Sequence, residues 1–348
     1  MEQALDPRLG DTLLRWYNND HRDLPWRRTR DPYAIWISEI MLQQTRVEAV
    51  LGYYHRFLTK LPDLQALADC SEPQLLKLWE GLGYYSRVRN MQKCARHLLE
   101  YREGRFPQTA PELEKLPGIG PYTAGAIASI AFGKPAPAID GNVLRVVTRL
   151  TRDDTPIDKP ALKNRIHELL LPLYRPGVCG EMTQALMELG ATVCLPGSPK
   201  CQNCPCREFC RAAIVGDANL YPVRPEKKPR RQEKLTVFLL RCGEHTAIRR
   251  RGDTGLLASL WEFPNVSGHL SPAEAIAWAQ KQGLEVTDIR RSTEKTHIFT
   301  HIQWQMLSYL LEVRNTSGDL TWPTIQQLDS AIALPTAFKQ FREELDHV

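Results

Sequence analysis

The sequence predicts two folded parts, a mostly α-helical N-terminal part and a smaller C-terminal domain of the α+β class. Apolar residues recur at three- and four-residue spacing before residue 220, whereas runs of β-branched and aromatic residues typical of strands are concentrated after residue 230. A basic, proline-rich segment separates these two regions. A chain of 348 residues is long enough for about two domains.

The N-terminal part contains several predicted helices. In residues 33–51, the spacing of the apolar side chains predicts one continuous helix. Ser71 and Thr109 each precede a helix in the pattern of a capping box, in which the side chain three positions later returns a hydrogen bond. A further helix over residues 88–99 follows an interruption at Gly81-Leu82-Gly83.

Residues 221–234 form the predicted linker, because they hold three prolines and six basic residues against two acidic ones. Residues 235–241 and 297–313 are predicted strands. Ser271 begins a predicted helix that runs to Gly283, again with a capping-box pattern. The expected domain boundaries are therefore 1–220, 221–234 and 235–348.

The composition is that of a globular protein. Hydrophobic residues make up 43% of the chain and charged residues 24%, which excludes a disordered chain. No stretch approaches the roughly 20 apolar residues of a membrane-spanning helix, and residues 1–22 lack the apolar core of a signal peptide. We therefore expect no membrane association. The net charge, 45 − 40 = +5, permits an anionic partner without identifying one.

Four cysteines in one short loop indicate a metal centre. The total of nine cysteines is odd, and nothing indicates an oxidising compartment in which disulfides would form. Four thiolates within residues 194–210 suit either a zinc ion or an iron–sulfur cluster, and the spacing alone does not decide between them. Cys206 falls outside the pattern and is predicted as a bystander. The candidate ligands, spaced Cys-x6-Cys-x2-Cys-x5-Cys, are Cys194, Cys201, Cys204 and Cys210.

Residues 116–126 have the pattern of two helices joined by a tight turn. Gly118 and Gly120 allow positive φ angles and close approach of the backbone, and Pro121 suits the first turn of the second helix. Free N–H groups at the start of that helix can bind a phosphate. The turn is therefore a candidate phosphate-binding element.

Two acidic residues are candidates for catalysis. Glu39 lies in an apolar helix, where burial would favour its protonated form and let it donate a proton near neutral pH. The alternative is an exposed residue or one paired with Arg15 or Arg46. Asp140 precedes another apolar helix, so it is either a simple N-cap or a catalytic carboxylate.

Together these motifs resemble the helix-hairpin-helix DNA glycosylases that carry a 4Fe–4S cluster. The Gly-x-Gly turn, an aspartate twenty residues later and the cysteine loop occur in that order. Three further motifs, Leu24-Pro25-Trp26 and residues 38–45 and 81–87, resemble the adenine DNA glycosylase (MutY) family. The resemblance extends over essentially the whole chain. It implies a six-helix barrel with an iron–sulfur subdomain, followed by a C-terminal α+β Nudix-like domain.

The family resemblance implies a base-excision activity, the hydrolysis of the N-glycosidic bond of adenine mispaired with 8-oxoguanine or guanine, after the base flips out of the duplex. Glu39 matches the residue that protonates adenine and then activates water. Asp140 matches the carboxylate that stabilises the oxocarbenium ion or forms a covalent intermediate. Tyr122 and Asn142 match residues that support these two carboxylates.

Further site residues are implied by the same resemblance. Contacts to adenine are implied for Trp26, Arg27 and Gln184, and the alternative for Trp26 is a plain core position. Insertion into the base stack is implied for Gln44 and Tyr84, a contact to 8-oxoguanine for Thr45, and contacts to the DNA backbone for Gly118 and Gly120. The implied ligands of the single 4Fe–4S cluster are Cys194, Cys201, Cys204 and Cys210.

Three departures from the family pattern refine these expectations. Lyases of the superfamily have a lysine where Tyr122 stands, and a Schiff base needs an amine, so we expect a monofunctional enzyme. The family motif Phe-Ser-His is Phe299-Thr300-His301 here, and the threonine keeps a hydroxyl for reading 8-oxoguanine. Residues 271–283 lack the glutamate-rich Nudix helix, so the C-terminal domain should recognise the lesion and hydrolyse nothing.

Two alternatives remain at this stage. An endonuclease III-like glycosylase for oxidised pyrimidines is disfavoured by Tyr122, and a catalytically silent iron–sulfur DNA-binding protein is disfavoured by the presence of both Glu39 and Asp140. The expected partners are double-stranded DNA with A:8-oxoguanine or A:G mispairs and repair or replication proteins that bind the linker. We expect a monomer in the bacterial cytoplasm, associated with the nucleoid.

Overall fold

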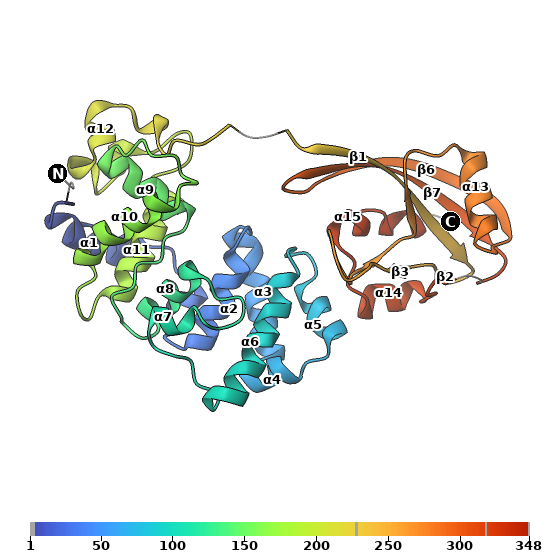
Figure 1. The fold of residues 1–348 in the computed structure, drawn as a ribbon, viewed down its shortest axis with the longest axis horizontal. Helices are drawn as coiled ribbons and strands as arrows, with labels where there is room; N and C mark the ends of the chain where they lie inside the picture. Colours follow the sequence, from blue (N-terminus) through green and yellow to red (C-terminus); the bar gives the residue numbers. More distant parts are fainter. Residues whose placement is uncertain (1–3, 227–228, 317–318, 347–348) are drawn as a thin grey trace. The chain divides into compact units, whose positions relative to one another are not determined.

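The computed structural model describes residues 4–226, 229–316 and 319–346, and the chain forms two compact units (Figure 1). The first unit comprises Met1–Asp69 and Arg89–Glu226, and the second comprises Cys70–Val88 and Lys227–Val348. The segment Cys70–Val88 therefore groups with the C-terminal residues, whereas the sequence analysis places it in the N-terminal domain.

The first unit consists of helices and their connections. Its α-helices are α1 (Arg8–Asp20), α2 (Pro32–Leu42), α3 (Val47–Lys60), α4 (Leu64–Asp69), α6 (Ser86–Arg102, which begins in the second unit), α7 (Ala110–Leu113), α8 (Pro121–Ile130), α9 (Gly141–Thr151), α10 (Pro160–Leu170), α11 (Cys179–Thr192) and α12 (Arg211–Val215). Its 3-10 helices are η1 (Pro25–Arg27), η2 (Leu171–Leu173), η3 (Cys201–Asn203), η4 (Arg207–Phe209) and η5 (Ala218–Leu220).

The helix predicted over residues 33–51 is two helices, α2 and α3, so its predicted continuity is wrong. The chain turns between them at Gln44, whose φ of 64° is incompatible with a continuing α-helix. The sequence could not mark this end, because α2 is buried on every face from Tyr33 to Met41 and has no amphipathic periodicity to lose.

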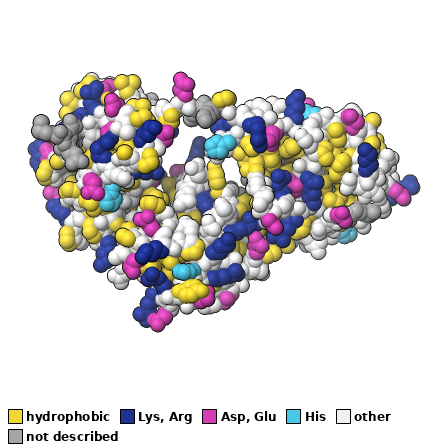
Figure 2. Space-filling view, viewed as in Figure 1, with side chains coloured by type: hydrophobic (Ala, Val, Ile, Leu, Met, Phe, Trp, Pro, Cys, Tyr) yellow, Lys and Arg dark blue, Asp and Glu magenta, His cyan; other side chains and the backbone are white. Residues whose placement is uncertain are grey.

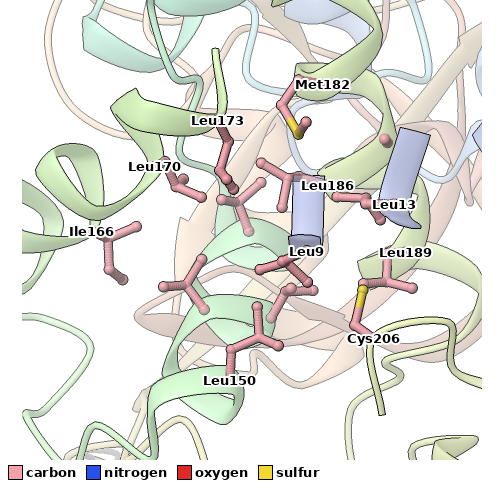
Figure 3. Packing of buried hydrophobic residues seen from close by; sticks show 14 of the residues in the cluster. Leu9, Leu13, Leu150, Ile166, Leu170, Leu173, Met182, Leu186, Leu189 and Cys206 are labelled. Atoms are coloured by element: carbon pink, nitrogen blue, oxygen red, sulfur yellow. The ribbon is translucent and has the colours of Figure 1, made fainter. Parts of the chain in front are cut away.

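A hydrophobic core joins α1, α9, α10 and α11 (Figure 3). Leu9 and Leu13 of α1 are 1% exposed, and they share this cluster with Leu186 and Leu189 of α11. Cys206, predicted as a bystander of the cysteine motif, is buried in the same core. The cysteine loop is thereby anchored to the helices that also carry part of the candidate site.

The second unit is an α+β structure. Its strands are β1 (Arg231–Cys242), β2 (His245–Thr246), β3 (Arg249–Arg250), β4 (Trp261–Glu262), β5 (Asn265–Ser267), β6 (Val286–Ile298) and β7 (Ile302–Val313). Its helices are α5 (Glu72–Trp79), α13 (Pro272–Lys281), α14 (Ile325–Ala331), α15 (Thr336–Lys339) and the 3-10 helix η6 (Arg342–Leu345). Because β1 begins at Arg231, it includes the last residues of the predicted linker 221–234.

The main sheet of the second unit has the order β2-β1-β7-β6, with β5 also paired to β1. β1 and β7 are parallel, and β6 and β7 are antiparallel. Val237 and Leu239 pack toward α14 and α15, whereas Phe238 and Leu240 pack toward α13 on the opposite face. This burial on both faces explains the continuous apolar run in the sequence.

The predicted helix caps differ in outcome. Ser271 forms a complete capping box with Glu274 at the start of α13, as predicted. Ser71 and Thr109 occupy the N-cap positions of α5 and α7, but neither makes the side-chain cap bond, so that part of the prediction is wrong. The Thr109 hydroxyl instead donates to the Glu112 carboxylate at 2.9 Å. Within the described residues, none of the helices has the length and apolar character needed to span a bilayer.

Candidate active site

A cavity of about 220 Å³ lies in the first unit, lined by η1, α2, α8, α9 and α11 and their connections. This volume is below the roughly 300–1,000 Å³ of drug-sized pockets and suits a single heteroaromatic ring system. A larger hollow of about 1310 Å³ beside α1, α10 and α12 is lined by none of the predicted site residues. The smaller cavity is lined by eight of them, which are Trp26, Arg27, Glu39, Thr45, Tyr122, Asp140, Asn142 and Gln184.

Glu39 is buried at the cavity wall, with 5% of its surface exposed. The Tyr122 hydroxyl donates a short hydrogen bond to its Oε2 atom, and no ion pair to Glu39 occurs in the part of the chain that the structure describes. Burial raises the pKa of Glu39 to about 7, and the nearby charge of Asp140 acts in the same direction. The alternative of an exposed or salt-bridged Glu39 is therefore wrong.

Tyr122 remains a neutral hydrogen-bond donor at physiological pH. It extends from the first turn of α8 and is partly buried at the cavity wall, and this burial raises its pKa well above the ordinary value, as do the charges of Glu39 and Asp140. Its hydroxyl therefore keeps its proton. Because that proton points to Oε2 of Glu39, Oε1 is left to carry the proton of the neutral carboxylic acid.

Asp140 is both the N-cap of α9 and a residue of the cavity wall. Its Oδ1 accepts from the Val143 backbone N–H at 2.8 Å, and its Oδ2 accepts from the Asn142 amide at 2.8 Å. Burial raises the pKa of Asp140, while these two bonds oppose that shift by favouring the anion. Asp140 therefore occupies both positions that the sequence allowed, since it caps α9 and its carboxylate lies in the cavity wall.

Asn142 is held from the opposite side by Arg145. The Arg145 guanidinium donates to Asn142 Oδ1 at 2.8 Å, and it also reaches the carbonyl oxygens of Gly190 and Cys194 at 2.8 and 2.7 Å. Gly190 of α11 allows Asn142 of α9 to lie this close, since a Cβ atom at position 190 would lie 2.6 Å from the Cβ of Asn142. The support of Asp140 therefore depends on close packing between α9 and α11.

The cysteine loop folds against the same core through η3 and η4. Among residues 4–226, 229–316 and 319–346, no group of three or more His, Cys, Asp or Glu side chains is arranged to hold a metal ion as it stands. The donor set nevertheless fits an iron–sulfur cluster or zinc chemically, because four thiols come from one loop. Arg149 Nη1 donates to Cys194 Sγ at 3.2 Å, and this contact opposes the burial that raises the pKa of the Cys194 thiol.

The predicted hairpin joins α7 and α8, and its two glycines differ. Gly118 has a φ of 74°, and a Cβ atom there would lie 2.6 Å from the Cβ of Asn90. Gly120 is the N-cap of α8 with a φ of −94° and open space where a Cβ atom would lie, so the positive φ that a glycine allows is not used at this position. Only Gly118 is required by the backbone conformation.

The remaining predicted DNA contacts lie outside the cavity. Gln44 occupies the turn between α2 and α3. Tyr84 belongs to the second unit, and its hydroxyl lies 3.0 Å from the Thr300 hydroxyl. Phe299, Thr300 and His301 form the turn between β6 and β7, where the Phe299 N–H donates to the Ile302 carbonyl at 2.8 Å.

Comparison with known proteins identifies the family of this chain. The model of the HhH-GPD superfamily base excision DNA repair protein matches residues 37–172, and the NUDIX domain matches residues 236–344. The adenine DNA glycosylase of Homo sapiens is 35% identical over 397 residues, which cover 94% of this chain and 72% of the human protein. The chain belongs to the adenine DNA glycosylase family. A member of the family from Buchnera aphidicola (strain Bp) is 33% identical, and the alignment covers 84% of this chain and 82% of that protein.

Solved structures agree with the fold of this glycosylase. A thermostable thymine-DNA glycosylase superimposes with a TM-score of 0.54 at 30% identity, covering 59% of this chain and 95% of that protein. A trapped endonuclease III–DNA covalent intermediate gives a TM-score of 0.52 at 26% identity, and the superposition covers 60% of this chain and 95% of that protein. The predicted fold class is confirmed, and the chain is an enzyme of the DNA glycosylase class.

Sequence reasoning missed a buried carboxylate in the adenine DNA glycosylase cavity. Glu188 is 0% exposed, and it pairs with Arg27 at 2.6 Å and Arg22 at 2.8 Å. Burial acts to raise the pKa of Glu188, but the two arginines outweigh this and hold it at about 2. One signal was available, since Glu188 lies four residues after Gln184 and therefore on the same face of α11.

Proposed function

We propose that this glycosylase hydrolyses the N-glycosidic bond of adenine mispaired with 8-oxoguanine or guanine, with the adenine flipped out of the DNA duplex into the cavity. The observation that supports this most strongly is the pair of carboxylates in one cavity of single-base size, Glu39 and Asp140. Glu39 has a pKa near 7 and can carry a proton, whereas Asp140 accepts two hydrogen bonds that favour its anion.

Glu39 is proposed as the general acid and then the general base. Its Oε1 proton moves to a ring nitrogen of adenine, so that the base leaves neutral when the bond to C1′ breaks. The Tyr122 bond to Oε2 fixes the orientation of the carboxyl group during this transfer. After adenine has left, the oxygen of a water molecule attacks C1′. The Glu39 carboxylate takes a proton from that water, and this transfer restores the carboxylic acid.

Asp140 is proposed to stabilise the positive charge that develops on the sugar. The Asn142 amide and the Val143 N–H hold its carboxylate in place as the cap of α9. The anion either pairs with the oxocarbenium ion or forms a bond to C1′ that water later breaks. Without an amine at position 122, no Schiff base can form there, and we propose a monofunctional enzyme.

Cys194, Cys201, Cys204 and Cys210 are proposed to hold one 4Fe–4S cluster. The cluster would supply no step of the hydrolysis but would cross-link the loop that packs on α9 and α11. Absorption spectroscopy and metal analysis of the purified protein test this assignment. We expect a yellow-brown protein with about four iron atoms per chain, whereas a colourless protein with one zinc atom per chain would overturn the assignment.

The base opposite adenine is proposed to be read by two residues of the first unit, Gln44 and Thr45, together with Tyr84 and the 299–301 turn of the second unit. Gln44 and Tyr84 would enter the base stack, Thr45 would contact 8-oxoguanine, and the 299–301 turn would contact the lesion through Thr300. The contact between the Tyr84 and Thr300 hydroxyls, both in the second unit, supports a joint role for these two residues. Repair or replication proteins that bind residues 221–234 are further proposed partners.

Base release from matched duplexes tests the proposed function. The purified full chain is mixed with duplexes that differ only in the base opposite one adenine, namely 8-oxoguanine, guanine or thymine. We expect the fastest adenine release opposite 8-oxoguanine, slower release opposite guanine and none opposite thymine. Release of oxidised pyrimidines in preference to adenine, or equal release from all three duplexes, would contradict the proposal.

A further inference from the structure

The segment between α5 and α6, in the second unit, has a strained backbone that ends in an exposed aromatic side chain. Gly81, Gly83 and Tyr84 have φ angles of 100°, 67° and 48°. Glycine adopts such angles readily, but they are exceptional for a side chain as bulky as that of Tyr84. Tyr84 is also 53% exposed, so burial of its ring does little to compensate for this backbone. Contacts with neighbouring residues therefore have to hold the conformation of Tyr84.

Two side chains bind the carbonyl group that precedes Tyr84. Trp79 Nε1 donates to the Gly83 carbonyl oxygen at 3.0 Å, and Arg87 Nη2 donates to the same oxygen at 3.1 Å. The Arg87 Nη2 atom also donates to the Leu82 carbonyl oxygen at 2.8 Å. The Arg87 backbone N–H donates to the carbonyl oxygen of Tyr84 itself at 2.9 Å. Arg87 thus binds three consecutive carbonyl groups, those of residues 82, 83 and 84.

The guanidinium of Arg87 also contacts two aromatic rings. It lies 5.2 Å from the centroid of the Trp79 ring and 5.7 Å from that of the Tyr84 ring, within the range in which a ring attracts a cation. Burial lowers the pKa of Arg87 to about 10, so the group stays charged at physiological pH. Because Trp79 is 0% exposed, Arg87 connects a ring fixed in the interior to the exposed ring of Tyr84.

A further contact fixes the outer end of the Tyr84 side chain, since its hydroxyl lies 3.0 Å from the Thr300 hydroxyl. The ring is therefore held at its backbone, at one face and at its hydroxyl. Arg87 covers one face and leaves the opposite face of this exposed ring to stack on a base, as aromatic side chains do in nucleic-acid binding. A ring that is fixed in advance can stack without the loss of conformational entropy that a mobile side chain undergoes.

We propose that Arg87 is a positioning residue for lesion recognition, which holds the Tyr84 ring in the exposed conformation that enters the base stack. This inference rests on the proposed insertion of Tyr84 and adds to it the residue that prepares the ring. Arg87 acts through Tyr84 and not through a contact of its own with the DNA.

The test measures the lesion preference of the full chain carrying Arg87→Met, which keeps an apolar side chain and removes the guanidinium. Single-turnover adenine release is followed below saturation on two duplexes, with 8-oxoguanine or guanine opposite adenine. We expect the ratio of the first rate to the second to fall by roughly threefold to tenfold, the value of one such contact. Release opposite guanine should stay near the parental rate, because Arg87 does not line the cavity.

Arg56→Met is the matched control. Arg56 of α3 lies 4.6 Å from the centroid of the Tyr53 ring, so this variant also removes one positive charge and one contact between a cation and a tyrosine. No DNA contact is proposed for Tyr53, and we expect the parental ratio. In a Tyr84→Leu background, which should itself have a lowered ratio, Arg87→Met should cause no further fall.

Arg87→Lys carries the test if Arg87→Met fails to fold. Lysine keeps the positive charge but lacks the planar group that lies over two rings while it binds two carbonyl groups. We expect a ratio between those of the parent and of Arg87→Met. A contact with a DNA phosphate would instead be kept by lysine, because it depends on charge alone.

Several results would overturn the inference. They are a parental ratio in Arg87→Met or in Arg87→Lys, an equal fall in Arg56→Met, and a further fall when Arg87→Met is added to Tyr84→Leu. A parental ratio with equally slower release on both duplexes would assign Arg87 to the DNA backbone. A failure of the proposed function looks different, because the parental enzyme would then show no preference for 8-oxoguanine, or Tyr84→Leu would keep the parental ratio.

Discussion

Glu39 lowers the stability of the folded chain at the pH where it is expected to act. Its pKa is about 7 in the folded protein, against an ordinary value of 4.5, because its carboxylate is buried. The unfolded chain therefore releases this proton at lower pH than the folded chain does. The free energy of unfolding should fall as the pH rises from 4.5 through 7 and then level off.

Replacing Glu39 by Gln should remove this pH-dependent loss of stability. The neutral amide can still accept the Tyr122 hydroxyl, so we expect Glu39→Gln to match the parent at pH 5 and to be more stable at pH 8 by up to about 3 kcal/mol. Urea denaturation at both pH values measures the difference. Equal stabilities at pH 8 would show that the carboxylate is not held in a desolvating environment.

Asp140 combines a structural role with a proposed catalytic one, and Asp140→Asn separates the two. Asparagine keeps the cap bond to the Val143 N–H, but its NH2 group faces the donating Asn142 amide, so the variant should lose about 1–3 kcal/mol of stability. The loss of the negative charge should lower the rate of adenine release by at least about 100-fold. Thermal unfolding and single-turnover kinetics give the two values. A variant that keeps the parental rate would assign Asp140 to capping alone.

At the scale of elements, the hairpin shows why two glycines in one motif are not equivalent. Gly118 has a left-handed backbone and contacts Asn90, whereas Gly120 has an ordinary φ and open space. The sequence pattern does not distinguish the two glycines, because it shows which residues can adopt a positive φ and not which residue the fold requires to do so.

Alanine substitutions at the two glycines test this difference. Gly118→Ala should destabilise the chain by about 2 kcal/mol or more, through backbone strain and the close contact with Asn90, and should weaken DNA binding. Gly120→Ala, the matched variant, should cost less than about 1 kcal/mol. Chemical denaturation and duplex-binding titrations provide the comparison. Equal losses in both variants would contradict the account of the turn.

The elements also show how far the sequence alone leads. Local signals predicted the Ser271 helix and the buried strand that contains Phe238, because capping and apolar runs depend on neighbouring residues. The end of α2 was missed, since a helix buried on every face has no polar side to mark its limits. The ion pairs of Glu188 were missed for another reason. Its partners Arg22 and Arg27 lie 166 and 161 residues away, and only the folded chain brings them together.

At the scale of the whole molecule, the segment Cys70–Val88 is built into the second unit. Glu80 Oε1 accepts from the Leu334 backbone N–H at 2.9 Å, and its Oε2 lies 2.9 Å from Lys339 Nζ and 3.0 Å from Lys77 Nζ. The sequence could not reveal this grouping, because about 140 residues of helical chain separate the segment Cys70–Val88 from the C-terminal residues. Tyr84 and Thr300 meet as a result.

Lesion preference tests the role proposed for the second unit. In the full chain, Thr300→Ala should reduce the ratio of adenine release opposite 8-oxoguanine to release opposite guanine by several-fold, about the value of one hydrogen bond. Thr300→Ser keeps the hydroxyl and should retain the parental ratio. Single-turnover rates on the two duplexes measure it. A parental ratio in the alanine variant, or a similar loss in the serine variant, would contradict this role.

The net charge of +5 does not identify the DNA-binding surface. On the face seen in Figure 2, Lys and Arg side chains are spread among Asp and Glu. The proposed selectivity therefore depends on placed groups, such as the hairpin N–H groups and the carboxylate pair, rather than on total charge.

Single-turnover adenine release by Glu39→Gln tests the central claim most directly. On an A:8-oxoguanine duplex, the account predicts that the variant binds with the parental affinity and releases adenine at least about 100-fold more slowly, since it has no proton to transfer. The Glu39→Asp variant, which keeps an acid, should retain part of the rate. Release by Glu39→Gln at the parental rate would contradict the proposed mechanism.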